Sequence, residues 1–267
     1  MRFIIRASSL PGFQDCARRA AGRVFRPLLS DAGFTLRDTM QHIGASVGTA
    51  THAALAHTFG EKIRTGELGN ATEDEQVGLE SLADTMANGV QFDATTPERN
   101  TAEKQVLRMY RIFRLTVAPA MNPMAVESAM QLTTQNGNLV SGHIDLSADG
   151  IHDYKTGTVR RQNMAQMGCY SILSRANGDA PGAITEHYIQ RVPVSEMQPD
   201  PVAYAFDREL SERVAAQTIL RVEQMAATFQ IDGDPQAFPA NPMSVLCSQK
   251  FCGAWGTEYC REHTGAK

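Results

Sequence analysis

The sequence predicts an α/β fold in which helices flank a central mixed sheet. Three observations support this prediction. Alternating apolar and polar residues indicate strands at about 127–135, within the segment 142–157, and at 184–192. Helix-forming stretches at about 160–175 and 206–229 follow these strands. Strands that alternate with helices along a chain are typical of α/β folds.

Composition points to a globular, non-membrane protein. The 267 residues are 42% hydrophobic and 20% charged, a balance that supplies a sizeable core. No apolar run approaches the roughly 20 residues of a spanning helix, and the opening residues 1–6 are too short for a signal peptide. We therefore expect a cytoplasmic protein. The net charge of −4 does not by itself indicate nucleic-acid binding, although a locally positive groove would be enough for such binding.

A predicted β-hairpin at 142–157 is the most informative stretch. The turn Ala148-Asp149-Gly150 is expected to place Gly150 in the left-handed conformation and Asp145 opposite Asp153. Directly opposed carboxylates lie about 5 Å apart and repel each other, unless a divalent cation binds between them. Lys155 falls on the same face as Asp153, because side chains alternate along a strand. Two acids and a lysine on one face suit hydrolysis of a phosphodiester with Mg²⁺ or Mn²⁺.

A solvated surface hairpin is the alternative, because Asp-x-Lys alone is a weak signal. The extended pattern Gly-x-Ile-Asp-Leu…Ile-x-Asp-Tyr-Lys-Thr-Gly is more specific. With it the chain resembles the PD-(D/E)XK nuclease superfamily, and within it the RecB-like nucleases that include Cas4 and the AddB nuclease domain. The resemblance covers about Gly44 to Tyr170 and extends to both chain ends. It implies one nuclease domain over 1–267, with a restriction-endonuclease-like core at about 44–192, a helical insertion at about 61–119 and a cysteine-rich tail at 241–263.

The resemblance also implies a set of metal ligands. A Gly-x-x-x-His helix in these nucleases carries a liganding histidine, and Gly48 and His52 match it. A helical histidine that only packs is the alternative. The other implied ligands are Asp145, Asp153 and the Tyr154 carbonyl. Glu127, at the start of the preceding strand, is expected beside the metal site, where it contacts the ion through water or holds the geometry.

The helix after the hairpin is expected to complete the catalytic site. Gln166 and Tyr170 lie four residues apart and match the family's Gln-x-x-x-Tyr motif. The resemblance implies that they face the scissile phosphate or support Lys155, which would orient or activate the attacking water. The alternative is an amphipathic helix with an incidental polar stripe.

The five cysteines are unevenly placed. Three fall within fourteen residues near the C-terminus, and the resemblance groups them with an early one as ligands of a [4Fe–4S] cluster: Cys16, Cys247, Cys252 and Cys260. The late spacing of four and then seven intervening residues is wider than usual in that family. Zinc on the same thiolates, with His263 able to replace one ligand, and reduced unligated thiols are the alternatives. Cys169 is expected to be a buried thiol.

Two basic helical stretches have alternative interpretations. Arg18, Arg19, Arg23 and Arg26 on an N-terminal helix at 8–29 form either a solvated face or a phosphate contact. The stripe Arg108, Arg111 and Arg114 is read as a solvated face first and as a DNA contact second.

The resemblance implies a metal-dependent deoxyribonuclease, with exonuclease action on single strands or duplex ends. DNA recombination or repair and phage or CRISPR-type DNA processing are the expected settings, with recombination or CRISPR-type proteins as partners. A catalytically inactive DNA-end binding or assembly protein of the same fold is one alternative. A zinc-stabilised interaction protein is another.

Overall fold

The computed structural model describes residues 2–161, 163–180 and 182–263, with side chains described as far as Cys260. The strands are β1 (Ile4–Arg6), β2 (Gln41–His42), β3 (Val90–Gln91), β4 (Ala125–Thr133), β5 (Leu139–Ser147), β6 (Gly150–Gly157), β7 (Ala183–Gln190) and β8 (Val202–Phe206). The α-helices are α1 (Leu10–Asp15), α2 (Ala17–Val24), α3 (Arg26–Asp31), α4 (Ile43–Thr65), α5 (Ala71–Met86), α6 (Arg99–Thr116), α7 (Met164–Ala176) and α8 (Arg208–Asp232). Short 3₁₀ helices are η1 (Ala7–Ser9), η2 (Ala118–Ala120), η3 (Pro235–Ala237) and η4 (Glu258–His263).

The central sheet is mixed, as predicted. Its order is β1-β5-β6-β7-β8, and β4 also pairs with β5. The β1/β5 and β6/β7 pairs are parallel and the other pairs are antiparallel. Because parallel neighbours need a crossover connection, α7 lies in the chain between β6 and β7. The α/β fold class is therefore confirmed.

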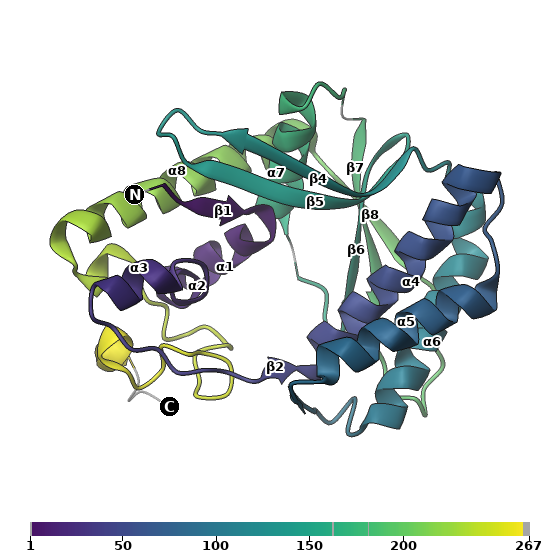
Figure 1. The fold of residues 1–267 in the computed structure, drawn as a ribbon, viewed down its shortest axis with the longest axis horizontal. Coiled ribbons are helices and arrows are strands. Elements are labelled where there is room, and N and C mark those ends of the chain that lie inside the picture. The colour runs from purple at the N-terminus through teal and green to yellow at the C-terminus, as the bar shows by residue number, and fades with distance from the viewer. Residues whose placement is uncertain (1, 162, 181, 264–267) are drawn as a thin grey trace.

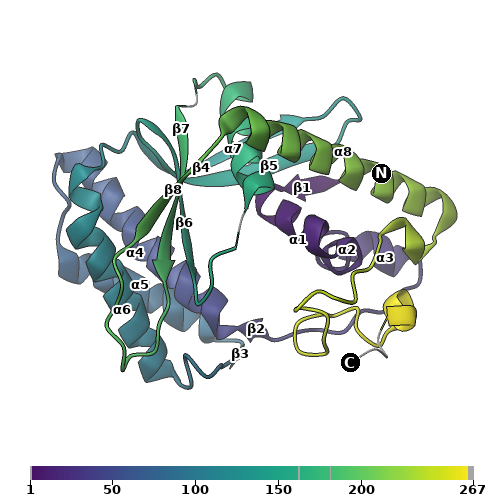
Figure 2. The ribbon, with the colours of Figure 1, turned by 180° about the vertical axis from the view of Figure 1, so that it is seen from behind.

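Helices cover the sheet in two groups, each with its own core. Helices α4, α5 and α6 gather on one side, and α1, α2, α3, α7 and α8 lie with the C-terminal tail on the other (Figure 1 and, from behind, Figure 2). Strand β5 contributes Ile144 to the core of the second group and Leu146 to that of the first. Strand β6 does the same with Ile151 and Tyr154. The hairpin formed by β5 and β6 thus lies where the two cores meet.

The two chain ends pack together. The expected single helix at 8–29 is divided into α1, α2 and α3, and Cys16 at the first break has an extended backbone with φ −149°. Arg18 is not on a solvated or phosphate-binding face, because it is 1% exposed. It donates hydrogen bonds to the carbonyls of Phe238 and Tyr259 and to the Gln236 side chain. This buried guanidinium joins α2 to the tail.

The arginine stripe on α6 forms intramolecular contacts, and its Arg111 also remains solvent-exposed, as the solvated-face interpretation expects. Arg108 donates to three backbone carbonyls in the loop after β7. Arg111 pairs with Glu75 at 2.7 Å, and Arg114 pairs with the fully buried Asp74 at 2.5 Å. All three guanidinium groups therefore attach α6 to its neighbours.

Within the described residues, no helix is long and apolar enough to span a membrane.

Helices α7 and α8 approach each other closely at Gly168. A Cβ atom there would lie 1.9 Å from the Ser211 carbonyl oxygen, far inside contact distance. Gly60, inside α4, has open space where its Cβ would be. The helix packing therefore requires glycine at position 168 but leaves room for a side chain at position 60.

We predict that Gly168→Ala lowers the free energy of unfolding by roughly 1–3 kcal/mol or more, because overpacking forces the helices apart. The matched variant Gly60→Ala should raise the free energy of unfolding by about 0.5–1 kcal/mol, through better helix propensity. Urea unfolding of both variants measures this. Equal effects of the two substitutions would contradict the close contact.

Candidate metal centre and catalytic site

The hairpin between β5 and β6 has the predicted register. Leu146 pairs with His152 and Ser147 with Ile151. The ladder stops there, so the predicted cross-strand pair of Asp145 and Asp153 was wrong. Strand β6 instead pairs with β7 along its whole length. As β5 and β6 diverge, Asp145 Oδ2 accepts a 2.7 Å hydrogen bond from the Tyr154 N–H.

The turn glycine has a different role from the predicted one. Gly150 is not among the described glycines with positive φ. A Cβ atom at this position would lie 2.2 Å from the Ala183 carbonyl oxygen on the neighbouring strand. Gly150 is needed for close approach of β7, and the left-handed conformation was a wrong prediction.

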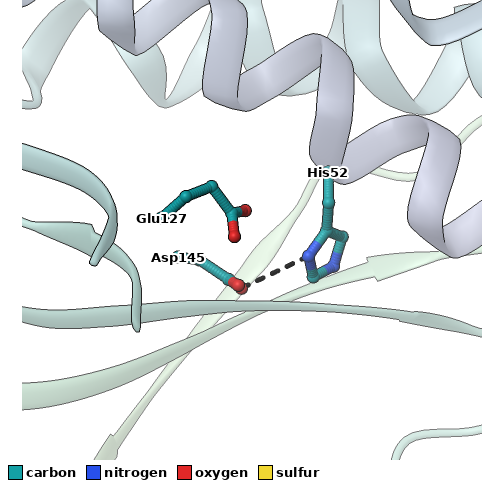
Figure 3. Close-up of side chains that lie close together, drawn as sticks. All are labelled: His52, Glu127 and Asp145. Carbon is teal, nitrogen blue, oxygen red and sulfur yellow. Dashed lines mark ion pairs between the residues drawn. The ribbon is translucent and has the colours of Figure 1, made fainter. Parts of the chain in front are cut away.

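Three candidate metal ligands converge from three elements (Figure 3). His52 on α4, Glu127 on β4 and Asp145 on β5 each offer a ligand atom, and these atoms all lie within 4.8 Å of one another. His52 Nδ1 is 3.4 Å from Asp145 Oδ2. Partial burial and the charge of Asp145 raise the pKa of Glu127. Glu127 is therefore close enough to be a direct ligand.

The backbone of Glu127 adopts an unusual conformation. Its φ of 47° makes it the one non-glycine residue with positive φ among those described. Its neighbours stay in register, since Val126 pairs with Leu146 and Ser128 with Ile144. The left-handed conformation costs a side chain about 1–2 kcal/mol. Such strain concentrates at functional sites, and here it lies at the candidate ligand itself.

The buried Asp153 and the partly exposed Lys155 form an ion pair beside this cluster. Lys155 Nζ is 2.7 Å from Asp153 Oδ2, so the two share a face as predicted. Burial raises the pKa of Asp153 to about 6, and the Asp145 charge adds to the rise while Lys155 opposes it. Burial opposes ionisation of Asp145 as well, but His52, Lys155 and the Tyr154 N–H lower its pKa. The pKa of Lys155 is raised, because Asp153 and Asp145 outweigh burial.

This donor set fits a divalent cation. Two carboxylates and an imidazole suit Mg²⁺ or Mn²⁺, which prefer oxygen and accept nitrogen ligands. The buried Asp153 Oδ2 contacts Lys155 but has no hydrogen bond of good geometry within the described residues. A carboxylate oxygen left this way is available to a cation or its water. The Tyr154 ring lies edge-on to His52, with ring centroids 5.6 Å apart, and packs β6 against α4.

Helix α7 places the predicted Gln166 and Tyr170 next to the acids. Gln166 Nε2 donates a 2.7 Å hydrogen bond to the Tyr170 hydroxyl, and both side chains are buried. Burial raises the pKa of Tyr170, and the charges of Asp153 and Asp145 contribute. Tyr170 is therefore within electrostatic reach of both aspartates.

Glu186 is an acid of this region that sequence reasoning missed. It lies on β7 directly beside Asp153 in the parallel register and is fully buried. Arg160 pairs with Glu186 at 2.7 Å. The negative charge of Glu186 contributes to the raised pKa of Lys155. An acidic residue inside a predicted buried strand was the available signal.

Four cysteines line one pocket: Cys16, Cys247, Cys252 and Cys260. The Asn241 N–H donates to Cys16 Sγ at 3.4 Å, and the Trp255 N–H donates to the Cys252 carbonyl at 3.1 Å. The fifth, Cys169, lies apart on α7, where burial raises its pKa to about 12. The side chain of His263 lies outside the described part of the chain.

The four sulfur atoms do not all lie as close together as the sulfur ligands of a bound zinc ion. Tetrahedral zinc with Zn–S bonds of about 2.3 Å holds its sulfurs about 3.8 Å apart. Among the described residues, the group His52, Glu127 and Asp145 is the one set whose ligand atoms lie within 4.8 Å of one another. No three of the four described sulfur atoms meet that limit.

The family can now be assigned. A family model of the PD-(D/E)XK nuclease superfamily matches residues 6–260. The chain belongs to this superfamily. A crystal structure of a candidate exonuclease from Eubacterium rectale matches with a TM-score of 0.57 and 10% sequence identity, covering 84% of this chain and 82% of that one. At this identity the likeness shows a shared fold. No curated protein matches.

We predict that Glu127→Gln weakens Mn²⁺ binding by roughly tenfold or more, because a neutral amide is a poorer ligand than a carboxylate. Isothermal titration calorimetry with MnCl₂ measures the affinity. Glu209→Gln, an exposed acid on α8, is the matched control and should bind Mn²⁺ like the wild type. Unchanged affinity of Glu127→Gln would remove this residue from the ligand set.

Proposed function

We propose that this nuclease hydrolyses DNA with Mg²⁺ or Mn²⁺ and acts from strand ends as an exonuclease of the RecB-like type. The observation that carries the proposal is the convergence of His52, Glu127 and Asp145 beside the Asp153–Lys155 pair. A catalytically inactive DNA-binding protein of the same fold has no need of neighbouring buried acids, because the repulsion between their carboxylates destabilises the protein.

The chain's own residues divide the work of the metal centre. His52, Asp145 and Asp153, with the Tyr154 carbonyl, would hold the cation, and we add Glu127 to this ligand set. The bound cation polarises the phosphate and lowers the pKa of its water. Asp145 enters the reaction ionised, because His52 and Lys155 hold its pKa low.

Lys155 acts as a cation in this proposal. Its raised pKa keeps the ammonium group protonated near neutral pH, so it orients the attacking water and stabilises developing negative charge on the phosphate. Asp153 fixes the ammonium at 2.7 Å. Gln166 and Tyr170 support this arrangement from α7 through their shared hydrogen bond.

Action on ends and the biological setting follow from resemblance. The similar Eubacterium rectale protein is itself described as a candidate exonuclease. RecB-like nucleases trim DNA in recombination, repair, phage and CRISPR-type processing, and we propose a setting of this kind with protein partners from the same process.

We also propose a [4Fe–4S] cluster on Cys16, Cys247, Cys252 and Cys260. Four thiols from both chain ends around one pocket supply the ligand count. Zinc on the same four thiolates is the alternative, and the Asn241 N–H that donates to Cys16 would stabilise a bound thiolate.

We predict that Lys155→Met lowers the rate of DNA cleavage by about 10²–10³, the loss typical of removing one charge-stabilising donor. The measurement is Mn²⁺-dependent release of nucleotides from end-labelled strands. Lys104→Met, at an exposed position on α6, is the control and should cleave normally. Wild-type rates in a folded Lys155→Met protein would refute the assigned centre.

A second prediction concerns the cysteines. Cys16→Ala, purified without oxygen, should lose visible absorbance and iron, since one of four cluster ligands is gone. Cys169→Ala removes a thiol outside the pocket and should keep both. Iron analysis and the absorbance spectrum give the result. A colourless wild-type protein with stoichiometric zinc would replace the cluster with zinc.

A further inference from the structure

A groove lined by arginine and serine side chains runs beside the edge strand β1. We call it the arginine groove, and it has a volume of about 430 Å³. Its polar lining comes from β1, η1 and α2: Arg6, Ser8, Ser9, Arg19 and Arg23. Arg19 and Arg23 lie four residues apart on α2 and so share one helix face.

The groove carries positive charge that the protein does not neutralise. Arg6 and Arg23 are exposed and form no ion pair within the part of the chain that the structure describes. Arg19 is 9% exposed and pairs with Asp15 at 2.8 Å, while its buried Nε has no hydrogen-bond partner among the described residues. This unbalanced charge stands out in a chain with a net charge of −4.

Sheet register places the groove on the same face as the metal centre. Arg6 pairs with Ser141 on β5, while the neighbouring pair Ile5 and Val140 is buried in the opposite face. Ser141, His143 and Asp145 alternate along β5 and so face the same side as Arg6. The four residues from Ser141 to Asp145 span about 13 Å at roughly 3.3 Å per residue. His143 between them is exposed.

The N-terminal segment also contacts the catalytic helix. Ala7, between Arg6 and Ser8, packs where β5 meets α7: the space at Gly142 is bounded by Ala7, Tyr170 and Leu173. Ala7, next to Arg6 in the chain, therefore lies near the predicted site residue Tyr170 on the face of β5 opposite Ser141 and His143.

The C-terminal tail fixes the far side of the groove. Arg19 lines both the groove and the cysteine pocket. Its partner Asp15 accepts a 2.7 Å hydrogen bond from Ser244 in the tail, and Asn241 donates to the Asp15 carbonyl. The cysteine pocket thus holds α2 in place behind the groove.

We propose that the arginine groove binds the sugar-phosphate backbone of a single DNA strand whose end lies at the metal centre. This inference rests on the proposed nuclease function. Arginine and serine side chains are common donors to phosphate oxygens, and such contacts position a strand without reading its sequence. Strand β5 runs between the two sites, and its alternation places them on one face.

The test uses full-length protein and a fluorescein-labelled oligothymidylate of twenty nucleotides in EDTA, so that binding is measured without cleavage. Fluorescence anisotropy gives the affinity over a range of salt concentrations. The double variant Arg6→Ala/Arg23→Ala should lower the salt slope by about 1.4, since each lost phosphate contact on a single strand contributes about 0.7. That change corresponds to roughly 25-fold weaker binding at 0.1 M salt.

Two controls separate charge from structure. Arg213→Ala removes an exposed α8 arginine outside the groove and should leave the slope unchanged. Arg6→Lys/Arg23→Lys keeps the charge and should retain most of the slope. Wild-type affinity of the double alanine variant, or equal losses in the lysine variant, would overturn the proposal.

A small substrate separates this inference from the nuclease function. The substrate is thymidine 5′-(p-nitrophenyl phosphate), whose Mn²⁺-dependent hydrolysis needs the metal centre. This ester is too short to reach the arginine groove, so the double alanine variant should hydrolyse it at the wild-type rate. Loss of this hydrolysis in the variant would place Arg6 and Arg23 in the centre and contradict the groove. Inactivity of the wild type on both this ester and DNA would refute the nuclease, whereas the anisotropy would still decide the groove.

Discussion

Asp145 and Asp153 are buried near each other at the point where β5 and β6 diverge, and the rest of the site depends on this constraint. Strand β6 leaves β5 after two pairs to run beside β7, which keeps the carboxylates out of direct opposition. Their charges still interact, because burial and Asp145 together raise the pKa of Asp153. Lys155 and the Tyr154 N–H offset part of this repulsion. A divalent cation would offset the remainder.

The surrounding fold holds that arrangement from both sides. Helix α4 supplies His52 from one core, and α7 supplies Tyr170 from the other. The Tyr154 ring stacks on Phe59 and lies edge-on to His52, so one residue packs both the core and a candidate metal ligand. At Glu127, a left-handed backbone in an otherwise regular strand turns a carboxylate toward the same point. Strain at that residue is consistent with a ligand position.

The sequence was informative where chemistry is local. The hairpin register and the Asp153–Lys155 face follow from periodicity, and the three late cysteines follow from their spacing in the chain. The Gln166–Tyr170 pair and the addition of Cys16 follow from the family resemblance. Long-range packing was not legible. Arg18 and Arg114 looked like surface charges, yet they bind carbonyls and a buried acid contributed by distant segments. Gly150 looked like a turn residue, but its role is set by β7. Glu186 was hidden for the same reason, since only the β6/β7 register places it beside Asp153.

The chain ends and the catalytic centre form one connected unit. Arg18 joins α2 to the tail, Asp15 joins Arg19 to Ser244, and Ala7 packs near Tyr170.

The binding of a divalent cation at this site is tested most directly by anomalous diffraction. Crystals soaked in MnCl₂ and measured at the manganese absorption edge should show a peak bounded by His52, Glu127 and Asp145. A peak elsewhere, or none in crystals of active protein, would contradict the claim.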